Sequence, residues 1–577
     1  MLLLLVVALA AQAAPPLATE AAKSAYLRTG RMDEVERLCQ AFAARYPRQV
    51  VCSSFGVTPE GRKMPVLVVS ADGVLTPRAA RTKRRPVVLF QGGIHAGEID
   101  GKDAGFALLS ELLEGKTLPG VLKQVTVVFV PVFNVDGHER FGPNQRPNQV
   151  GPESTGWRVT AQNLNLNRDY VKADAPEMVA MLKLLHAWDP SVFLDLHVTD
   201  GAQFQPDVAV LLDTATDDAG LMRMGTLLRT ELFAELTQEG HHPLDFYPSF
   251  VKDDQPASGF VRSAAPPRFS QAYWAAQGRI GILVETHSWK KYAARVKTTR
   301  DVLAGTLRIV GEQGAGFLAA GAAADAASKD VPATLTLTYV PSEKKETLAF
   351  DGYAYTMEKD ALSGVPYPRY DPSKPEVWKV PVYGVKPGLT VSLPRGGYLV
   401  PAAWVPLVEP RLLAHGLRYR KLARVPASEL ERFHATQKTF SPASFEGHQG
   451  LSVQGTWEKV SRGFATGALF VPMAQPGFRL VAHLFEPLGP DSLLSWGYFN
   501  ASFEQKEEIE SYVIEPWAHA LLAKDPQQKA AFEAKLAADP VFAKDPAARL
   551  RYFAKLHPSW DTELDVYPVL RTQNSIP

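Results

Sequence analysis

An apolar strand, a glycine turn and an apolar helix follow one another directly early in the chain, and this order constrains the fold most. The strand is predicted at residues 86–90 and the helix at residues 103–113. The turn between them carries His95 and Glu98, and a spacing of three places both side chains on one face of a helical turn. An imidazole and a carboxylate are two of the ligand types that zinc accepts. A solvated helix start, with the carboxylate near the helix N-terminus, is the alternative interpretation.

Two later apolar runs also end in a residue that can bind a metal or move a proton. One run leads into His197 and the other into Glu285. In open α/β sheets, sites form beyond the carboxyl ends of the strands, so we expect both residues at the edge that holds His95 and Glu98. Two histidines and a glutamate are a ligand set of catalytic zinc that leaves one position for water, and Glu285 is then a candidate base. A hydrogen-bonded structural role is the alternative for each residue taken alone.

A polar segment between these strands is a candidate for substrate binding. Asn163, Asn165 and Asn167 alternate with leucines, which predicts a strand with one polar face. Such a face is costly between buried strands unless it meets a ligand or a polar network. The planar guanidinium of Arg168 can bind a carboxylate through two hydrogen bonds and could hold an anionic substrate terminus. Structural salt bridges are the alternative.

Length, charge and cysteine content limit the class of protein. A chain of 577 residues predicts two or three domains. The net charge of +1 and the lack of a basic patch argue against nucleic acid or an anionic membrane as a partner. Cys39 and Cys52 are the only cysteines, which excludes a zinc finger or a disulfide-built fold. They could pair in an oxidising compartment, and an unpaired buried thiol is the alternative for Cys39.

The N-terminus indicates export. Residues 1–14 have a short apolar core followed by Ala-x-Ala, which resembles a secretory signal peptide. They lack a basic start, which an upstream start or an atypical signal would explain. The apolar stretch is too short to span a membrane, and no second candidate of about 18 residues follows. We therefore expect an exported protein, periplasmic or secreted, with no membrane span.

The pattern of elements changes along the chain. Strands alternate with helical patterns over residues 22–318, which predicts an α/β catalytic domain. The Ala- and Gly-rich segment 314–328 is typical of a linker or a fraying helix end. A proline-rich region with alternating strands predicts a β-rich accessory domain at residues 330–480. Helical patterns predict a mixed or helical C-terminal region at residues 481–577.

The motifs in this order resemble the carboxypeptidase A-like zinc metallocarboxypeptidases. They are H-x-x-E after a strand, then L-N-R, then a strand-end histidine and a strand-end glutamate. Residues 55–62 and 134–139 also look like that family, and the resemblance covers about residues 30–315. It implies an α/β fold with a mixed, mostly parallel sheet flanked by helices. It also implies one zinc ion and a peptide substrate with a free C-terminal carboxylate.

The resemblance assigns a role to each residue at the predicted sheet edge. His95, Glu98 and His197 match the zinc ligands of the family. Glu285 matches the catalytic glutamate, which serves first as general base and then as general acid.

Four further residues match, or approximate, the groups that bind substrate in the family. Asn167 and Arg168 match the pair that binds the C-terminal carboxylate. Arg158 fits the arginine that stabilises the tetrahedral oxyanion, and Arg146 is the alternative for that role.

The chain departs from the family pattern at two positions. Family members commonly carry an aspartate where this chain has Asn165, oriented toward a zinc histidine, so that support is expected to be weaker or to come from elsewhere. The family also has a substrate-contacting tyrosine upstream of the catalytic glutamate. Tyr273 is the candidate here, although its spacing is short, and Tyr247 is the alternative.

The predicted function is hydrolysis of C-terminal peptide bonds by a zinc metallocarboxypeptidase acting on exported or periplasmic peptides. A zinc-dependent amidohydrolase or deacylase, or a peptidase of peptidoglycan stem peptides, would use the same metal residues. An inactive peptide- or glycan-binding protein is a third interpretation. The presence of Glu285 argues against it, since a missing base would be its sign.

Overall fold

The computed structural model describes residues 17–213 and 218–576. The predicted signal peptide, residues 1–14, therefore lies outside the described residues. Among the helices of the described ranges, none combines the length and hydrophobicity that a membrane crossing requires.

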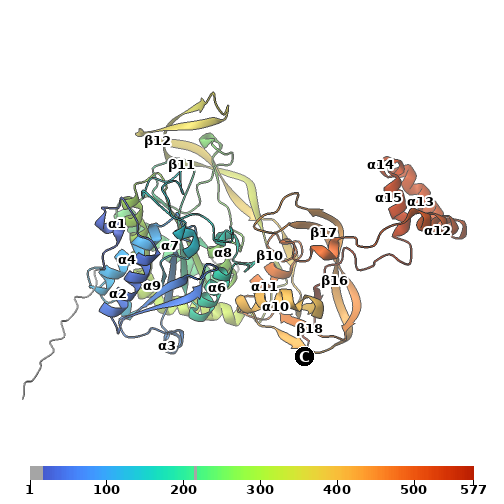
Figure 1. Ribbon diagram of the computed structural model, residues 1–577, viewed down its shortest axis with the longest axis horizontal. Coiled ribbons are helices and arrows are strands. Elements are labelled where there is room, and N and C mark those ends of the chain that lie inside the picture. The colour runs from blue at the N-terminus through green and yellow to red at the C-terminus, as the bar shows by residue number, and fades with distance from the viewer. Residues whose placement is uncertain (1–16, 214–217, 577) are drawn as a thin grey trace, which may run out of the picture.

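An eight-stranded mixed sheet forms the centre of the first half of the chain (Figure 1). Its strand order is β1-β2-β4-β3-β5-β9-β6-β7. The strands are β1 (Val50–Val57), β2 (Lys63–Val69), β3 (Val87–Gly92), β4 (Thr126–Val130), β5 (Val192–Val198), β6 (Val208–Asp213), β7 (Pro243–Leu244) and β9 (Ile280–Thr286). Strands β3, β5 and β9 are parallel neighbours and buried along their whole length, because helices cover both faces of the sheet.

Helices of very different length surround this sheet. They are α1 (Glu20–Lys23), α2 (Met32–Arg45), α3 (Pro77–Thr82), α4 (Asp100–Leu113), α5 (Val135–Glu139), α6 (Pro176–Trp188), α7 (Ala219–Gln238), α8 (Ser270–Ala276) and α9 (Tyr292–Ala327). Short 3-10 helices are η1 (Val121–Lys123), η2 (Leu166–Arg168) and η3 (Pro256–Ser258). Gly105 allows helix α4 to pack closely against the sheet, because glycine has no Cβ. A Cβ at this position would lie only 2.3 Å from the Phe129 ring. This close packing fixes the turn that precedes α4, which carries His95 and Glu98.

Two features left open by the sequence are now clear. The Ala- and Gly-rich segment is part of α9, with Phe317 and Ala320 buried, so it is not a linker. Cys39 of α2 and Cys52 of β1 form a disulfide.

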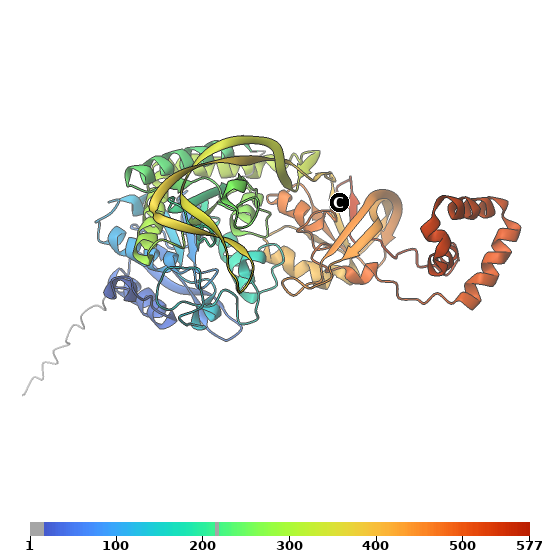
Figure 2. The ribbon, with the colours of Figure 1, turned by 90° about the horizontal axis from the view of Figure 1, so that it is seen from above.

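A long hairpin of the second half lies across the first half (Figure 2). Its strands are β11 (Tyr339–Lys359) and β12 (Pro366–Pro387), and β12 pairs in parallel with β8 (Phe260–Val261). Phe350 and Trp378 of the hairpin pack with Phe260 in a separate hydrophobic cluster. Beside the hairpin, β10 (Thr334–Thr336) pairs with β13 (Thr390–Ser392). The hairpin thereby joins the two halves of the chain through an apolar contact.

A six-stranded sheet organises the remainder, in the order β15-β18-β14-β19-β16-β17. Its strands are β14 (Gly397–Pro401), β15 (Arg420–Leu422), β16 (Val425–Phe440), β17 (Leu451–Phe464), β18 (Ala468–Pro472) and β19 (Leu570–Thr572). The other elements are η4 (Ala402–Trp404), α10 (Val405–Ala414), α11 (Phe478–Phe485) and η5 (Asn500–Phe503).

A group of four helices stands apart from the rest of the chain before it returns to the six-stranded sheet (Figure 1). These are α12 (Ser511–Lys524), α13 (Pro526–Ala538), α14 (Pro540–Lys544) and α15 (Pro546–Ala554). The predicted fold class is confirmed: a mixed sheet flanked by helices, then a β-rich part and a helical region. The return of the chain to β19 was not predicted, and the domain limits inferred from the sequence stay predictions.

Candidate active site

The structure brings His95, Glu98 and His197 together at the carboxyl ends of β3 and β5. Glu98 Oε1 lies 3.0 Å from His95 Nδ1, and Glu98 Oε2 lies 2.8 Å from His197 Nδ1. All three side chains are buried, and one ligand atom from each lies within 4.8 Å of the others. The cluster forms because β3 and β5 are adjacent parallel strands that end at the same edge.

The second nitrogen of each imidazole is held by another side chain. His95 Nε2 lies 3.1 Å from Asn165 Oδ1, and His197 Nε2 lies 2.8 Å from Asp195 Oδ2. When these nitrogens donate, both Nδ1 atoms are left as acceptors that face Glu98, which is the arrangement a shared cation needs. The donor set and its supporting contacts therefore fit zinc.

Asp195 was missed by the sequence analysis, although a signal for it exists. It stands two residues before His197 in β5, and residues two apart on a strand share a face. Gln91 Nε2 donates to Asp195 Oδ1 at 2.8 Å, which fixes the carboxylate in place. His95 is supported by Asn165. Although Asn165 stands where the family commonly has an aspartate, its side-chain oxygen still provides an acceptor for His95 Nε2.

The polar segment at residues 163–168 is not a strand, contrary to the prediction. Leu166–Arg168 form the 3-10 helix η2, and Asn163 has a positive φ of 61°. Asn165 Oδ1 accepts a hydrogen bond from Asn167 N at 3.0 Å. Asparagine side chains bind nearby backbone groups in this way and compete with strand pairing, which explains the error.

Glu285 lies opposite His197 in the register of β9 and β5. Its side chain is buried, and within the described residues its Oε2 has no hydrogen-bond partner. Burial raises the pKa of Glu285 to about 8, assisted by the charges of Glu98 and Asp200 and opposed by those of His197 and Arg146. A carboxyl group with a pKa near neutrality can both accept and return a proton.

Both candidate oxyanion arginines reach the carboxylate of Glu98. Arg146 Nη1 lies 2.8 Å from Glu98 Oε1, and Arg158 Nη1 lies 3.3 Å from the same oxygen. Arg146 is buried and also donates to the carbonyl of Val198, whereas the Arg158 side chain is 38% exposed. Arg158 is therefore the freer of the two to turn toward a bound substrate.

Burial opposes ionisation of Glu98, but Arg146 and the two histidines hold its pKa well below the usual range.

Asn167 and Arg168 lie beside this cluster. Asn167 Nδ2 is 3.5 Å from His197 Nε2, and its Oδ1 is buried without a partner among the residues described. Arg168 stacks over Phe269, with 4.4 Å between the guanidinium carbon and the ring centre. In the described ranges no carboxylate forms an ion pair with Arg168. Burial and the nearby Arg158 lower the pKa of Arg168, so an added anion would be stabilised there.

The structure corrects the candidate tyrosine. Tyr273 is buried in the core, where its hydroxyl lies 3.1 Å from His415 Nδ1 and 3.1 Å from His186 Nε2. It is not brought together with the sheet-edge residues. Tyr247 is half-buried, and its hydroxyl lies 3.5 Å from Asp200 Oδ1. Burial raises the pKa of Tyr247, and the charges of Glu285, Asp200 and Glu98 raise it further. The short spacing of Tyr273 was the signal that pointed to this error.

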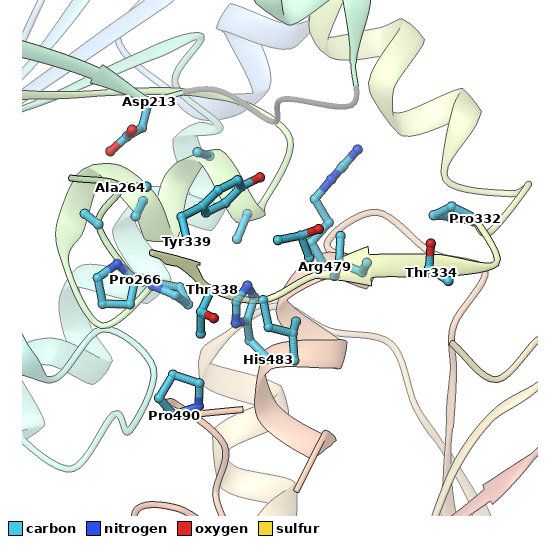
Figure 3. A pocket seen from close by; sticks show the side chains of 18 residues that line it. Asp213, Ala264, Pro266, Pro332, Thr334, Thr338, Tyr339, Arg479, His483 and Pro490 are labelled. Atoms are coloured by element: carbon cyan, nitrogen blue, oxygen red, sulfur yellow. The ribbon is translucent and has the colours of Figure 1, made fainter. Parts of the chain in front are cut away.

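Two other features resemble sites but do not belong to this one. A cavity of about 460 Å³ opens between α8 and the second half, near Asp213 and His483 (Figure 3). Among the described residues that line it, none belongs to the predicted site.

Glu239, His241 and Asp301 also lie within ligand distance of one another. Both His241 nitrogens engage carboxylates, and cationic side chains pair with Asp301, so this group is an ion-pair network.

Comparison with known proteins agrees with this geometry. Residues 35–225 match the model of the zinc carboxypeptidase family. An inactive metallocarboxypeptidase from Sclerotinia sclerotiorum is 26% identical over 138 residues, which are 23% of this chain. The match spans about a fifth of the length of that curated relative (22%).

Solved structures to which the chain is similar include metallocarboxypeptidases. One, from Burkholderia cenocepacia, is 18% identical, with 48% of this chain and 68% of that chain covered at a TM-score of 0.35. Carboxypeptidase A from Helicoverpa armigera is 15% identical, with 51% and 74% covered at a TM-score of 0.36.

Proposed function

We propose that the protein is a zinc-dependent carboxypeptidase that removes C-terminal residues from peptides. The observation that carries this proposal is the position of Glu285, buried and partly unpartnered, directly opposite His197 of the His95–Glu98–His197 cluster. A ligand set for zinc and a base for water lie at one edge of one sheet, which is the requirement for zinc-assisted hydrolysis.

His95, Glu98 and His197 would hold one zinc ion, since their three ligand atoms converge and their other polar atoms are anchored. When bound, zinc supplies Lewis acidity, which lowers the pKa of water toward about 7 and polarises a scissile carbonyl.

The surrounding residues supply the remaining steps. Glu285 takes the proton from the attacking water and passes it to the leaving amine. Arg158 donates to the oxygen on which negative charge develops, a contribution of about 3 kcal/mol for a well-placed donor. Arg168 and Asn167 bind the free carboxylate of the terminal residue, which restricts cleavage to the C-terminal bond.

An inactive binding protein is the competing interpretation, favoured by the similarity to an inactive relative. Glu285 supports activity, since it supplies the base that hydrolysis requires. Amidohydrolase or deacylase chemistry, and cleavage of peptidoglycan stem peptides, would use the same cluster with a different substrate.

The test is digestion of one peptide as its free acid and as its C-terminal amide by the zinc-loaded protein, followed by mass spectrometry. We expect stepwise loss of terminal residues from the free acid and no loss from the amide. Equal cleavage of both would indicate endopeptidase or deacylase chemistry. A zinc-loaded protein that binds the peptide without cleaving it would be an inactive binder.

We also propose that the protein is exported to the periplasm or secreted. The signal-like residues 1–14 support this, as does the Cys39–Cys52 disulfide, because disulfides persist in oxidising compartments. Cell fractionation tests it, and full retention in the cytoplasm would contradict it.

A further inference from the structure

The tip of the β16–β17 hairpin is a two-residue turn formed by Glu446 and Gly447. Phe445 N donates to His448 O at 2.8 Å, and His448 N donates to Phe445 O at 3.0 Å. Glu446 has a φ of +50° and Gly447 a φ of +78°, so both turn residues are left-handed. Asparagine, aspartate and glycine are favoured at the first position of such a turn. A glutamate there points to a role for its side chain.

This tip contacts the candidate substrate-binding segment. Glu446 Oε2 accepts a hydrogen bond from Asn165 N at 2.9 Å. His448 Nε2 lies 2.7 Å from Asp174 Oδ2, which fixes the tip from its other side. The second half of the chain therefore supplies a carboxylate to the edge of the site, beside the segment that ends in Arg168.

Most charges around Arg168 are already paired. Arg268 binds Asp491 with 2.6 Å between Nε and Oδ1, and Arg158 lies 3.3 Å from Glu98. The negative charge of Glu446 favours the charged form of Arg168, but the two side chains form no ion pair within the described residues. Glu446 Oε1 likewise accepts no hydrogen bond in the ranges that the structure describes. One cation and one anion are thus left to complement a ligand that carries both charges.

Apolar surfaces flank these two charges. Phe269 lies under the guanidinium of Arg168. Phe445 is 51% exposed and stacks on Trp496, whose ring also lies beside Arg268, Lys172 and His448. Such surfaces suit the methylene stem of a long cationic side chain, which packs against apolar groups while its charged end stays polar.

We propose that Glu446 is a specificity-determining residue that selects substrates whose C-terminal residue has a cationic side chain. The α-carboxylate would bind Arg168 and the side-chain cation would bind Glu446. The inference rests on the proposed carboxypeptidase function and adds a substrate class to it. It also places part of the substrate site in the second half of the chain.

The experiment compares kcat/KM of the zinc-loaded full chain on three peptides that differ only in a terminal Lys, Leu or Glu. We expect Lys to be preferred over Leu, and Glu446→Gln to reduce that preference about tenfold or more. Glu446→Lys is expected to shift the preference toward terminal Glu. Glu446→Asn suits the positive φ, so it removes the long carboxylate while keeping the turn. Glu429→Gln, at the other end of the same hairpin and 68% exposed, is the control that leaves the preference unchanged.

Two results would overturn the inference: a Lys-to-Leu ratio that Glu446→Gln does not change, or equal losses on all three peptides. Binding of the same peptides to the Glu285→Gln variant, measured by fluorescence anisotropy, tests the substrate preference without cleavage. This measurement separates the inference from the proposed function. Cleavage without Lys preference would overturn the inference and leave the function standing. Lys-selective binding that depends on Glu446, without cleavage by the wild type, would support the inference and overturn the function.

Discussion

At the scale of single residues, the two candidate metal histidines differ in how they are supported. His197 pairs with the carboxylate of Asp195, whereas His95 faces the neutral amide of Asn165. A carboxylate raises the basicity of an imidazole ligand more than an amide does. His197 is therefore expected to be the stronger of the two ligands.

Replacing Asp195 by Ala should weaken zinc binding about 10- to 100-fold, because the imidazole of His197 loses its orienting acceptor. Competition with a chromophoric chelator measures this. Asp253→Ala, at an exposed aspartate, is the control. Unchanged zinc affinity in Asp195→Ala would show that Asp195 does not support a metal ligand.

Glu285→Gln should lower kcat/KM by at least about 100-fold while zinc stays bound, because the amide cannot accept the proton of water. Peptide hydrolysis and metal content are measured on the same sample. Full activity in this variant would remove Glu285 from the proposed mechanism.

At the scale of elements, the strands were more predictable than the loops. The convergence of His95, His197 and Glu285 could be predicted because parallel strands end at one sheet edge, whatever the length of the connections. The conformation at Asn165 could not, because asparagine side-chain hydrogen bonds override an alternating pattern. Glu446 could not be predicted either, since its contact with Asn165 joins residues 281 positions apart.

Three separate elements meet at His241, which follows α7. Its Nδ1 lies 2.7 Å from Asp207 before β6, and its Nε2 lies 2.9 Å from Asp301 of α9. Hydrogen bonds to these two carboxylates raise the pKa of His241 to about 9, against burial and the charge of Lys297. The pKa of Asp301 is about 2: burial opposes its ionisation, but His241, Lys297 and Arg300 outweigh that effect.

The network should make stability depend on pH. The stabilisation that this network gives to the folded state is fully present below the unfolded pKa of His241, near 6.5. It is lost as pH rises through the folded pKa of about 9. We expect His241→Gln to lower the free energy of unfolding by about 2 kcal/mol at pH 6 and by much less at pH 10. Urea unfolding at both pH values measures the difference. A loss that is equal at pH 6 and pH 10 would contradict this prediction.

At the scale of the whole molecule, one carboxylate connects the two halves. Asp174, before α6, binds Arg411 of α10 at 2.8 Å and His448 of the hairpin tip at 2.7 Å. It also accepts a hydrogen bond from Tyr498. Burial opposes its ionisation, but His448 and Tyr498, with the charges of two cations, hold the pKa of Asp174 well below its usual range. The candidate active site and the second half are thus parts of one structure.

Asp174→Ala should destabilise the protein by about 3 kcal/mol, because it leaves buried cationic partners without their anion. It should also weaken peptide binding, since the hairpin tip loses an anchor. Thermal unfolding and peptide affinity are measured together. Glu429→Ala, whose side chain is 68% exposed in its pair with Lys459, is the control with a small effect. If the two variants unfold alike, Asp174 does not hold the halves together.

The position of β19 makes the six-stranded sheet depend on a segment far from its other strands in the sequence. Residues 570–572 lie between β14 and β16, and Arg571 of this strand forms a buried pair with Glu486. The six-stranded sheet is therefore complete only when residues 570–572 are in place. The hairpin that carries Glu446 is attached to β19 through β16. The hairpin tip and the candidate substrate site are therefore expected to take their final positions only after residues 570–572 have joined the sheet.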